Sequence, residues 1–482
     1  MTLRYRAVGF VIGLLLAMLA LLMLLPAVFD LADGNRDWLS FLLGAAVTGI
    51  AGGYLIISCQ ASGPFELEVR DAFVLTAATW VAIPAFAALP LIGLGISYTD
   101  AFFESMSGLT TTGSTVLTGL DGLPRGILFW RALLQWIGGI GIIVMAIVIL
   151  PFLRVGGMQL FRTESSERSE KIVPNAFSMV AWILSVYGLL TLACGTLFLV
   201  FGMSAFDALC HAFSTLSTGG YSTHDASFGH FREPGAEWVA VVFMLAGGLP
   251  FAAYIRMVRG ERAALWREPQ VRGLLASLFV IILIGAAALV IDRSYAPLDA
   301  LREMAFNTVS IVTTTGFAST DYTLWGPFFV ALFFVLTFSG ACAGSTSGGI
   351  KVYRLQVLWL SLGAYLARTP SPHRVVVLRY GGRRLPDDVP FAVLGFLAAF
   401  LGSVALVTVL LGAMGLDFVT ALTAASTAIT NVGPGLGPVI GPAGNFAGLP
   451  DAAKWLLAFA MMLGRLEVFT VLIVLDPRFW RG

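Results

Sequence analysis

Long apolar runs alternate with short amphipathic segments along the whole chain. The apolar runs cover residues 8–29, 41–57, 72–96, 126–150, 177–201, 238–254, 274–291, 326–362, 391–414 and 455–475. The run 326–362 is interrupted by small residues. An apolar helix needs about 20 residues to cross the roughly 30 Å hydrocarbon core of a bilayer, so the pattern predicts about ten membrane spans.

Four short segments between these runs are too brief to cross a bilayer. Each is opened by an aspartate, and these are Asp100, Asp207, Asp299 and Asp417. Because backbone groups cannot stay unpaired in lipid, a segment that enters and returns must be buried against protein. The pattern therefore predicts four half-helices, each between two apolar runs.

A glycine-containing motif rich in hydroxyl side chains follows each half-helix. The copies are 110–113 (TTTG), 217–220 (STGG), 313–316 (TTTG) and 430–433 (TNVG). Their glycines fall roughly a hundred residues apart, which indicates an internal repeat. The pattern predicts an all-α integral membrane protein, with four pseudo-symmetric helix–pore loop–helix repeats around a central pore and two extra N-terminal transmembrane helices.

These repeats divide the chain into five parts. We expect the N-terminal pair of transmembrane helices in residues 1–65, pore repeat 1 in 66–160, repeat 2 in 161–262, repeat 3 in 263–385 and repeat 4 in 386–482. The first apolar run is longer than the core of a signal peptide, so we interpret it as an uncleaved helix.

The four motifs have the chemistry of a cation selectivity filter. A cation that enters a membrane must exchange its water shell for other oxygens, which rings of backbone carbonyls can supply. Glycine adopts the required backbone angles without a Cβ penalty, and the end of a half-helix adds partial negative charge. The predicted filter residues are Thr110, Thr111, Thr112, Gly113, Ser217, Thr218, Gly219, Gly220, Thr313, Thr314, Thr315, Gly316, Thr430, Asn431, Val432 and Gly433. The cation would bind at Thr111, Thr112, Thr218, Gly219, Thr314, Thr315, Asn431 and Val432.

Composition and charge place the chain in a membrane and orient it. Of its 482 residues, 58% are hydrophobic and 12% are charged, about half the charged fraction of a soluble domain. Basic residues gather in 154–171, 256–272 and 368–384, on the side of both termini. Since positively charged loops stay in the cytoplasm, we expect cytoplasmic termini and a filter that opens to the exterior. No basic patch interleaved with aromatics suggests nucleic-acid binding.

Residues 339–349 interrupt the second helix of repeat 3 and are nearly all small. Each glycine in a helix costs about 1 kcal/mol relative to alanine. One interpretation is a close-packing surface, and the other is an unwound loop that gates the pore below the filter. The predicted gate residues are Gly340, Ala341, Cys342, Ala343, Gly344, Ser345, Thr346, Ser347, Gly348, Gly349 and Arg465.

Arg465 lies halfway along the last apolar run. A charge there costs at least about 2.5 kcal/mol and must face protein or water. It could pair with a carboxylate such as Glu104, or place a fixed positive charge beside the ion path. We interpret Lys351 as an anchor at the cytoplasmic interface, and the four histidines show no metal-ligand spacing.

Together these motifs resemble the Trk/Ktr/HKT superfamily of potassium transporters. The resemblance rests on the four filter motifs and on 340–351, 433–437 and 464–469, and it covers nearly the whole chain. The extra N-terminal helix pair makes the chain most similar to TrkH-type members, the membrane subunits of bacterial Trk potassium uptake systems. Ser347 stands where that family more often has glycine.

The resemblance implies K⁺ uptake across the bacterial inner membrane through the filter, gated by the intramembrane loop and a cytoplasmic subunit. It also implies a homodimer in the lipid bilayer and a TrkA-type nucleotide-binding partner on the basic loops, since the chain has no nucleotide motif of its own. We expect no bound cofactor, with K⁺ as the transported ion. The alternative within this fold is a Na⁺-permeable transporter, or one that couples K⁺ to Na⁺ or H⁺. No nucleophile or acid–base cluster favours an enzyme.

Overall fold

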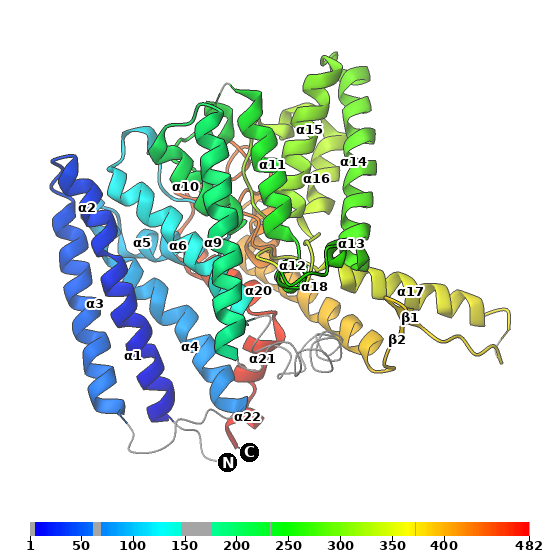
Figure 1. Ribbon diagram of the computed structural model, residues 1–482, viewed down its shortest axis with the longest axis horizontal. Coiled ribbons are helices and arrows are strands. Elements are labelled where there is room, and N and C mark those ends of the chain that lie inside the picture. Colours follow the sequence, from blue (N-terminus) through cyan, green and yellow to red (C-terminus); the bar gives the residue numbers. More distant parts are fainter. Residues whose placement is uncertain (1–4, 61–68, 146–175, 232, 372, 482) are drawn as a thin grey trace.

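The structure is a computed structural model that describes residues 5–60, 69–145, 176–231, 233–371 and 373–481 (Figure 1). Helices dominate this part of the chain. Two short strands, β1 (Arg379–Tyr380) and β2 (Arg383–Arg384), form an antiparallel hairpin after α17 (Val352–Arg368). The all-α fold predicted from the apolar pattern is confirmed.

The N-terminal helices α1 (Tyr5–Leu22), α2 (Leu24–Ala32) and α3 (Trp38–Cys59) form a hairpin at one edge of the molecule (Figure 1). Glycine permits α1 and α3 to approach closely, because a Cβ on Gly13 would lie 2.8 Å from the carbonyl oxygen of Gly52, and the converse distance is also 2.8 Å. Close backbone approach of this kind holds helices together in lipid. The two predicted N-terminal spans therefore pack on each other.

Four units of one design follow, each with a first long helix, a short pore helix and a second helix. The first helices are α4 (Val69–Ala87), α9 (Ala176–Val200), α14 (Pro269–Arg293) and α18 (Val389–Ala413). The pore helices are α5 (Tyr98–Leu109), α10 (Ala205–Leu216), α15 (Pro297–Val312) and α19 (Phe418–Thr430). The second helices are α6 (Arg125–Val144), α11 (Pro234–Gly248), α16 (Pro327–Thr337) and α20 (Asp451–Arg465).

Shorter elements join these helices. They are η1 (Leu89–Leu94), η2 (Leu120–Gly122), η4 (Ser227–His230), α12 (Phe251–Val258), α13 (Ala264–Arg267), η5 (Tyr322–Trp325), α21 (Phe469–Leu475) and α22 (Pro477–Arg481). In the described residues, seven helices are long and apolar enough to cross a membrane, and two bent pairs bring the number to nine. Residues 146–150 of one predicted span lie outside the described residues.

Two predicted spans are broken helices. The apolar runs 238–254 and 455–475 predict unbroken helices, whereas α11 and α12 meet at 93° and α20 and α21 meet at 113°. Pro250 has no amide hydrogen with which to continue α11, and Val468 has a φ of 34°. An apolar run indicates that a segment is buried in lipid or protein. It does not show whether the backbone hydrogen bonds of the helix continue without interruption, so these breaks could not be predicted from it.

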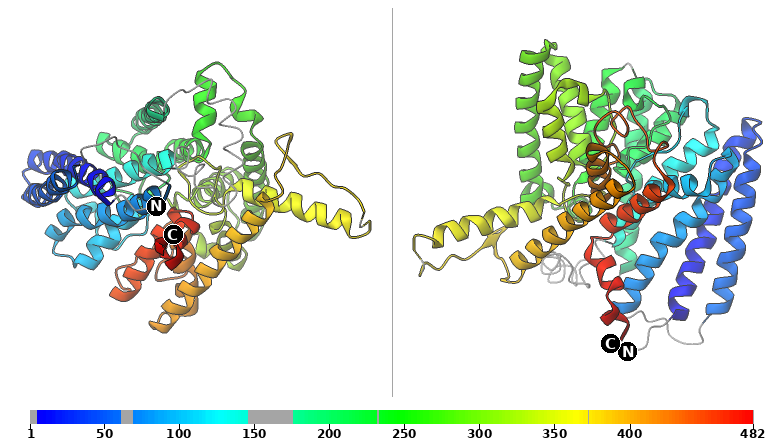
Figure 2. Two further views of the ribbon diagram at one scale, coloured as in Figure 1. Left: turned by 90° about the horizontal axis from the view of Figure 1, so that it is seen from below. Right: turned by 180° about the vertical axis from the view of Figure 1, so that it is seen from behind.

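The pore helices and α6 lie in the interior. For α6, 72% of the apolar window is buried, against 28–33% for the other long helices. α22 packs against the start of α4, with the rings of Phe479 and Phe73 6.2 Å apart. The start of α1 lies at the same end of the molecule as α22, while α17 and the β-hairpin project sideways (Figure 2). This arrangement places the four motifs at the centre.

Candidate functional site

Three of the four pore helices begin at a side-chain cap, and all four end at one of the motifs. Ser97 caps α5 by accepting a hydrogen bond from the amide of Asp100 at 3.1 Å, and α10 is capped in the same way. Asp417 is itself the cap of α19 and accepts from the amide of Thr420 at 3.1 Å. α15 has a proline in its first turn instead of a side-chain cap, with Asp299 nearby. The four aspartates thus favour helix starts, but from different positions.

All four motifs share one backbone conformation. The second residue of each motif is left-handed, with φ of 52° at Thr111, 52° at Thr218, 60° at Thr314 and 57° at Asn431. The glycine two residues later also has a positive φ, 88° at Gly113, 78° at Gly220, 82° at Gly316 and 107° at Gly433. Threonine rarely adopts such angles, so the surrounding structure must impose them.

The residue between these two positions donates its amide to its own pore helix. The donors are Thr112 to Ser107 at 2.9 Å, Gly219 to Ser214 at 2.9 Å, Thr315 to Ser310 at 2.8 Å and Val432 to Thr427 at 3.2 Å. These bonds close each helix in the manner of a Schellman cap. The four central residues therefore have the same orientation relative to their helices.

The four motifs form a closed ring. A Cβ on the glycine of each motif would collide with the central carbonyl oxygen of the next: Gly113 with Gly219, Gly220 with Thr315, Gly316 with Val432, and Gly433 with Thr112. The last contact returns to the first motif, so four carbonyl oxygens surround one axis in the order of the repeats. Such a ring can replace the hydration shell of a cation.

The second motif differs because it accommodates a side chain from α6. A Cβ on Gly219 would overlap the amide group of Gln135. Gln135 donates to the carbonyl of Gly219 at 2.5 Å and accepts from the amide of Tyr221 at 3.0 Å. A carbonyl oxygen has two lone pairs, so Gly219 can still offer one to an ion. We did not predict a role for Gln135, although a polar residue within an apolar run was the available signal.

A buried ion pair braces the first motif. Arg131 donates to Glu104 at 2.8 Å, and the two side chains are 2% and 1% exposed. Glu104 also accepts from the amide of Val116 at 2.9 Å, and Arg131 donates to the carbonyl of Ser222 at 3.0 Å. The pair therefore links α5, α6 and the segments that follow two motifs. Glu104 is the carboxylate that we considered for Arg465, and that alternative is wrong.

Residues 338–351 form an irregular loop between α16 and α17, directly against the motifs. The amide of Gly348 donates to the Thr314 hydroxyl at 2.6 Å, and the Thr218 hydroxyl donates to that of Thr346 at 3.1 Å. A Cβ on Gly348 would collide with the carbonyl oxygen of Thr430. The loop thus touches three of the four motifs, which a packing helix could not do.

The break in α11 supplies partners for this loop. The amides of Cys342 and Thr346 donate to the carbonyls at the end of α11, at 3.1 and 3.2 Å. The amide of Phe251 donates to the carbonyl of Gly344 at 2.9 Å. Backbone that is freed from a helix in a membrane must be paired in this way. The bend in repeat 2 and the loop in repeat 3 are therefore parts of one arrangement.

Arg465 holds the loop through a backbone carbonyl. Its Nη1 donates to the carbonyl of Thr346 at 2.8 Å, and the side chain is buried. Among the described residues, its Nε and Nη2 have no partner. A cavity of about 20 Å³ lies between Arg465 and the loop. That volume holds about one water molecule and no hydrated ion.

Lys351 differs from its prediction as an anchor at the membrane interface. It is 8% exposed, and its ammonium group donates to the carbonyl and to the hydroxyl of Ser347. The next basic residue, Arg354, is buried and pairs with Glu467 in the break of repeat 4. Lys351 and Arg354 are buried because the loop returns into the protein interior just before α17 begins.

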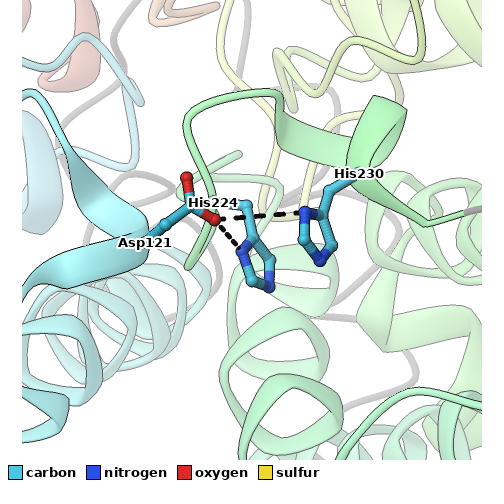
Figure 3. Close-up of side chains that lie close together, drawn as sticks. All are labelled: Asp121, His224 and His230. Carbon is cyan, nitrogen blue, oxygen red and sulfur yellow. Dashed lines mark hydrogen bonds and ion pairs between the residues drawn. The ribbon is translucent and has the colours of Figure 1, made fainter.

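The histidines fall into separate environments. His211 is fully buried on α10, between the carbonyl of Asp207 at 2.8 Å and the hydroxyl of Ser222 at 3.0 Å. His224 and His230 lie beside Asp121 at the mouth of the ring, on loops that sequence spacing could not bring together (Figure 3). A hydrogen bond from His224 lowers the pKa of the Asp121 carboxyl.

Known proteins are similar to this chain over nearly its whole length. A family model described as TrkH, cation transport protein, matches residues 39–480. The chain is 46% identical to the Trk system potassium uptake protein TrkI of Halomonas elongata, covering 99% of this chain and 97% of that protein. It is 36% identical to TrkH of Escherichia coli, with 99% of each chain covered.

A solved structure has the same fold. The crystal structure of the potassium transporter TrkH from Vibrio parahaemolyticus matches with a TM-score of 0.91 at 37% identity, covering 99% of this chain and 100% of that chain. A match of this extent includes the N-terminal hairpin, all four units and the loop between α16 and α17. The chain therefore belongs to the TrkH family of cation transport proteins.

Proposed function

We propose that this protein takes up K⁺ across the inner membrane through the ring of four motifs, without enzymatic chemistry. The observation that carries the proposal is the closed ring of central carbonyls, each in contact with the glycine of the preceding motif. Relatives that match almost every residue of the chain are named potassium uptake proteins. K⁺ would bind between the carbonyl and hydroxyl oxygens of the motifs named above, and residues 66–482 would form the four pore repeats.

The loop 339–349 and Arg465 would be the gate. The loop contacts Thr218, Thr314 and Thr430, so an ion that leaves the ring on this side meets it first. Arg465 adds positive charge beside the remaining cavity. Shortening the loop within 341–348 should raise K⁺ flux and weaken its dependence on a regulatory subunit.

Regulation would come from a cytoplasmic partner. The arginines of 256–272 and 368–384 form basic surface on the side of the chain ends, where a TrkA-type nucleotide-binding subunit and a second copy of the chain could dock. Positively charged loops favour the cytoplasm, which would leave the mouth lined by Asp121 and His224 outside the cell.

Ion flux in proteoliposomes tests the proposal. Purified protein should carry K⁺ down its gradient faster than Na⁺, and imposing or collapsing a proton gradient should leave the K⁺ flux unchanged. Equal fluxes of K⁺ and Na⁺ would support the Na⁺-permeable alternative. A K⁺ flux that requires Na⁺ or a proton gradient would support a symporter, and no flux of either ion would contradict the proposal.

A further inference from the structure

Three side chains of types that can ligate a metal lie close together at the mouth of the ring. Asp121 lies in η2, after the first motif, while His224 and His230 lie in the segment after the second motif. Their ligand atoms are all within 4.8 Å of one another (Figure 3). The two histidines are six residues apart in the chain, and Asp121 is more than a hundred residues away, so only folding assembles the group.

Both imidazoles direct the same nitrogen at one carboxylate oxygen. The Nδ1 atom of His224 is 2.5 Å from Oδ1 of Asp121, and the Nδ1 atom of His230 is 3.9 Å from that oxygen. The rings are stacked, with centroids 3.5 Å apart and planes 3° from parallel. Their Nδ1 atoms therefore lie on the same side of the pair, where a shared cation could accept a lone pair from each.

The ligand set suits a transition metal better than a hard cation. Two imidazoles and one carboxylate are the ligands of catalytic-type Zn²⁺ sites, which keep a fourth position for water. The side chains of Asp121 and His230 are 54% and 47% exposed, so that position is open to solvent. Calcium and magnesium would require more oxygen ligands than this group offers.

Binding requires a small rearrangement that the exposed side chains can make. Tetrahedral Zn²⁺ with bonds of about 2.0–2.1 Å separates its ligand atoms by about 3.4 Å. Asp121 must therefore retreat from His224, and His230 must approach and tilt out of the stack. His224 is the fixed ligand, because its side chain is 16% exposed and its ring packs edge-on against Phe231 at 5.5 Å.

A metal ion at this position would lie close to the path of a cation that enters the ring. A cavity of about 80 Å³ above the ring is lined by the four motif glycines and by His224. A divalent cation on His224 would place positive charge at the rim of that cavity, where a cation must pass. Charges in a narrow, partly desolvated mouth interact more strongly than charges in bulk water.

We propose that Asp121, His224 and His230 form a binding site for Zn²⁺ or a similar transition-metal cation, and that its occupancy lowers K⁺ flux through the ring. The first half of the proposal concerns binding alone. The second half rests on the proposed function, so the two are measured separately.

Equilibrium dialysis with Zn²⁺ alone tests the site. The full-length protein, purified without a polyhistidine tag, should bind one Zn²⁺ per chain. His230→Gln and Asp121→Asn should each weaken binding by at least about tenfold, since even indirect ligand partners contribute that much. His373→Gln is the matched control, because His373 is an exposed histidine in the segment between α17 and β1. Unchanged binding in both site variants, with elution volumes like wild type, would overturn the site.

Flux with and without Zn²⁺ tests the consequence. In proteoliposomes, Zn²⁺ on the side of the mouth should reduce K⁺ flux several-fold in wild type and in His373→Gln, and have no effect in His230→Gln. Bound Zn²⁺ that leaves wild-type flux unchanged would overturn the regulatory half. A wild-type protein that binds Zn²⁺ but carries no K⁺ would contradict the proposed function and leave the metal site supported by dialysis.

Discussion

Arg465 is a buried charge that contacts the loop 338–351 directly. Its guanidinium reaches the loop through one hydrogen bond to the carbonyl of Thr346, and no carboxylate of the described residues pairs with it. Two of its nitrogens remain without partners there. An unpaired charge is costly in a protein interior, so its retention indicates a role other than stability.

Arg465→Ala should raise K⁺ flux per molecule. A hydrogen bond from a charged group contributes about 1.5 kcal/mol, and its loss should shift the closed state toward the open state by up to about tenfold. Arg465→Lys keeps the charge and can still donate to Thr346, so it should resemble wild type. Flux in proteoliposomes, normalised to the reconstituted protein, measures both variants. Lower expression of Arg465→Ala without any gain in flux would make Arg465 structural.

The Glu104–Arg131 pair, unlike Arg465, should contribute to the stability of the folded protein. Arg131→Met leaves the Glu104 carboxylate buried without its partner, which should lower the free energy of unfolding by about 3 kcal/mol or more. Replacing both residues with methionine should recover part of that loss. Thermal unfolding in detergent measures the series, with Arg125→Met as the control on the exposed start of α6. Equal unfolding temperatures for Arg131→Met and the control would contradict this role.

At the scale of elements, the ring of four motifs depends on four helix ends with the same backbone conformation. Each pore helix ends in a left-handed residue, and each glycine lies against the neighbouring carbonyl. The three motifs with threonine at this position depend on the surrounding structure to keep this conformation, because threonine rarely adopts a positive φ, whereas asparagine at 431 adopts it more readily. The loop between α16 and α17 and the break after α11 form hydrogen bonds with each other, so each satisfies backbone groups that the other leaves unpaired.

Gly220→Val should abolish selective K⁺ uptake. Its Cβ would lie on the carbonyl oxygen of Thr315, and the backbone φ of 78° is unfavourable for a β-branched residue. Overpacking of this kind costs about 1–3 kcal/mol, so K⁺ flux should fall by about tenfold or more, or Na⁺ should enter. Gly122→Val is the control, because nothing lies within 4 Å of a Cβ there. Wild-type K⁺/Na⁺ preference in Gly220→Val would refute the filter assignment.

At the scale of the whole molecule, exposed arginines gather in two segments of the chain, 262–272 and 368–384. The arginines Arg262, Arg267, Arg272, Arg368, Arg374, Arg379, Arg383 and Arg384 are exposed. Arg256 is partly buried and pairs with Glu268, whereas the pair that Arg384 makes with Asp387 is fully on the surface. The exposed members are therefore free to be changed without breaking that pair.

Neutralising these exposed arginines together should abolish co-purification with a TrkA-type subunit, while the K⁺ flux of the isolated protein persists. Electrostatic complementarity governs such docking, so moderate salt should weaken the wild-type complex as well. The turn between α2 and α3, which contains Arg36, lies at the end of the molecule opposite the chain ends (Figure 1). Arg125 pairs with Asp33 beside that turn, so neutralisation of Arg36 and Arg125 serves as the control. Retained co-purification of the neutralised protein would contradict this docking surface.

The sequence by itself determined the class of this protein. Runs of apolar residues must be helices in lipid, and four hydroxyl- and glycine-rich motifs at similar spacing must follow the same local design. Residue type and spacing were enough to identify the four motifs, the segment 339–349 and Arg465. Each contains residues that an ordinary apolar helix lacks, such as glycines, hydroxyl side chains or a charge.

Only the tertiary structure decided which of these residues meet. By residue type Glu104 could have paired with Arg131 or with Arg465, and the fold gives it Arg131 because α5 and α6 lie side by side. The breaks after α11 and α20 and the burial of Lys351 depend on the loop that they contact. Asp121, His224 and His230 come together because two segments of different repeats fold over one mouth. Sequence spacing carries no record of such contacts, because they join residues that are far apart in the chain and meet only when the helices pack.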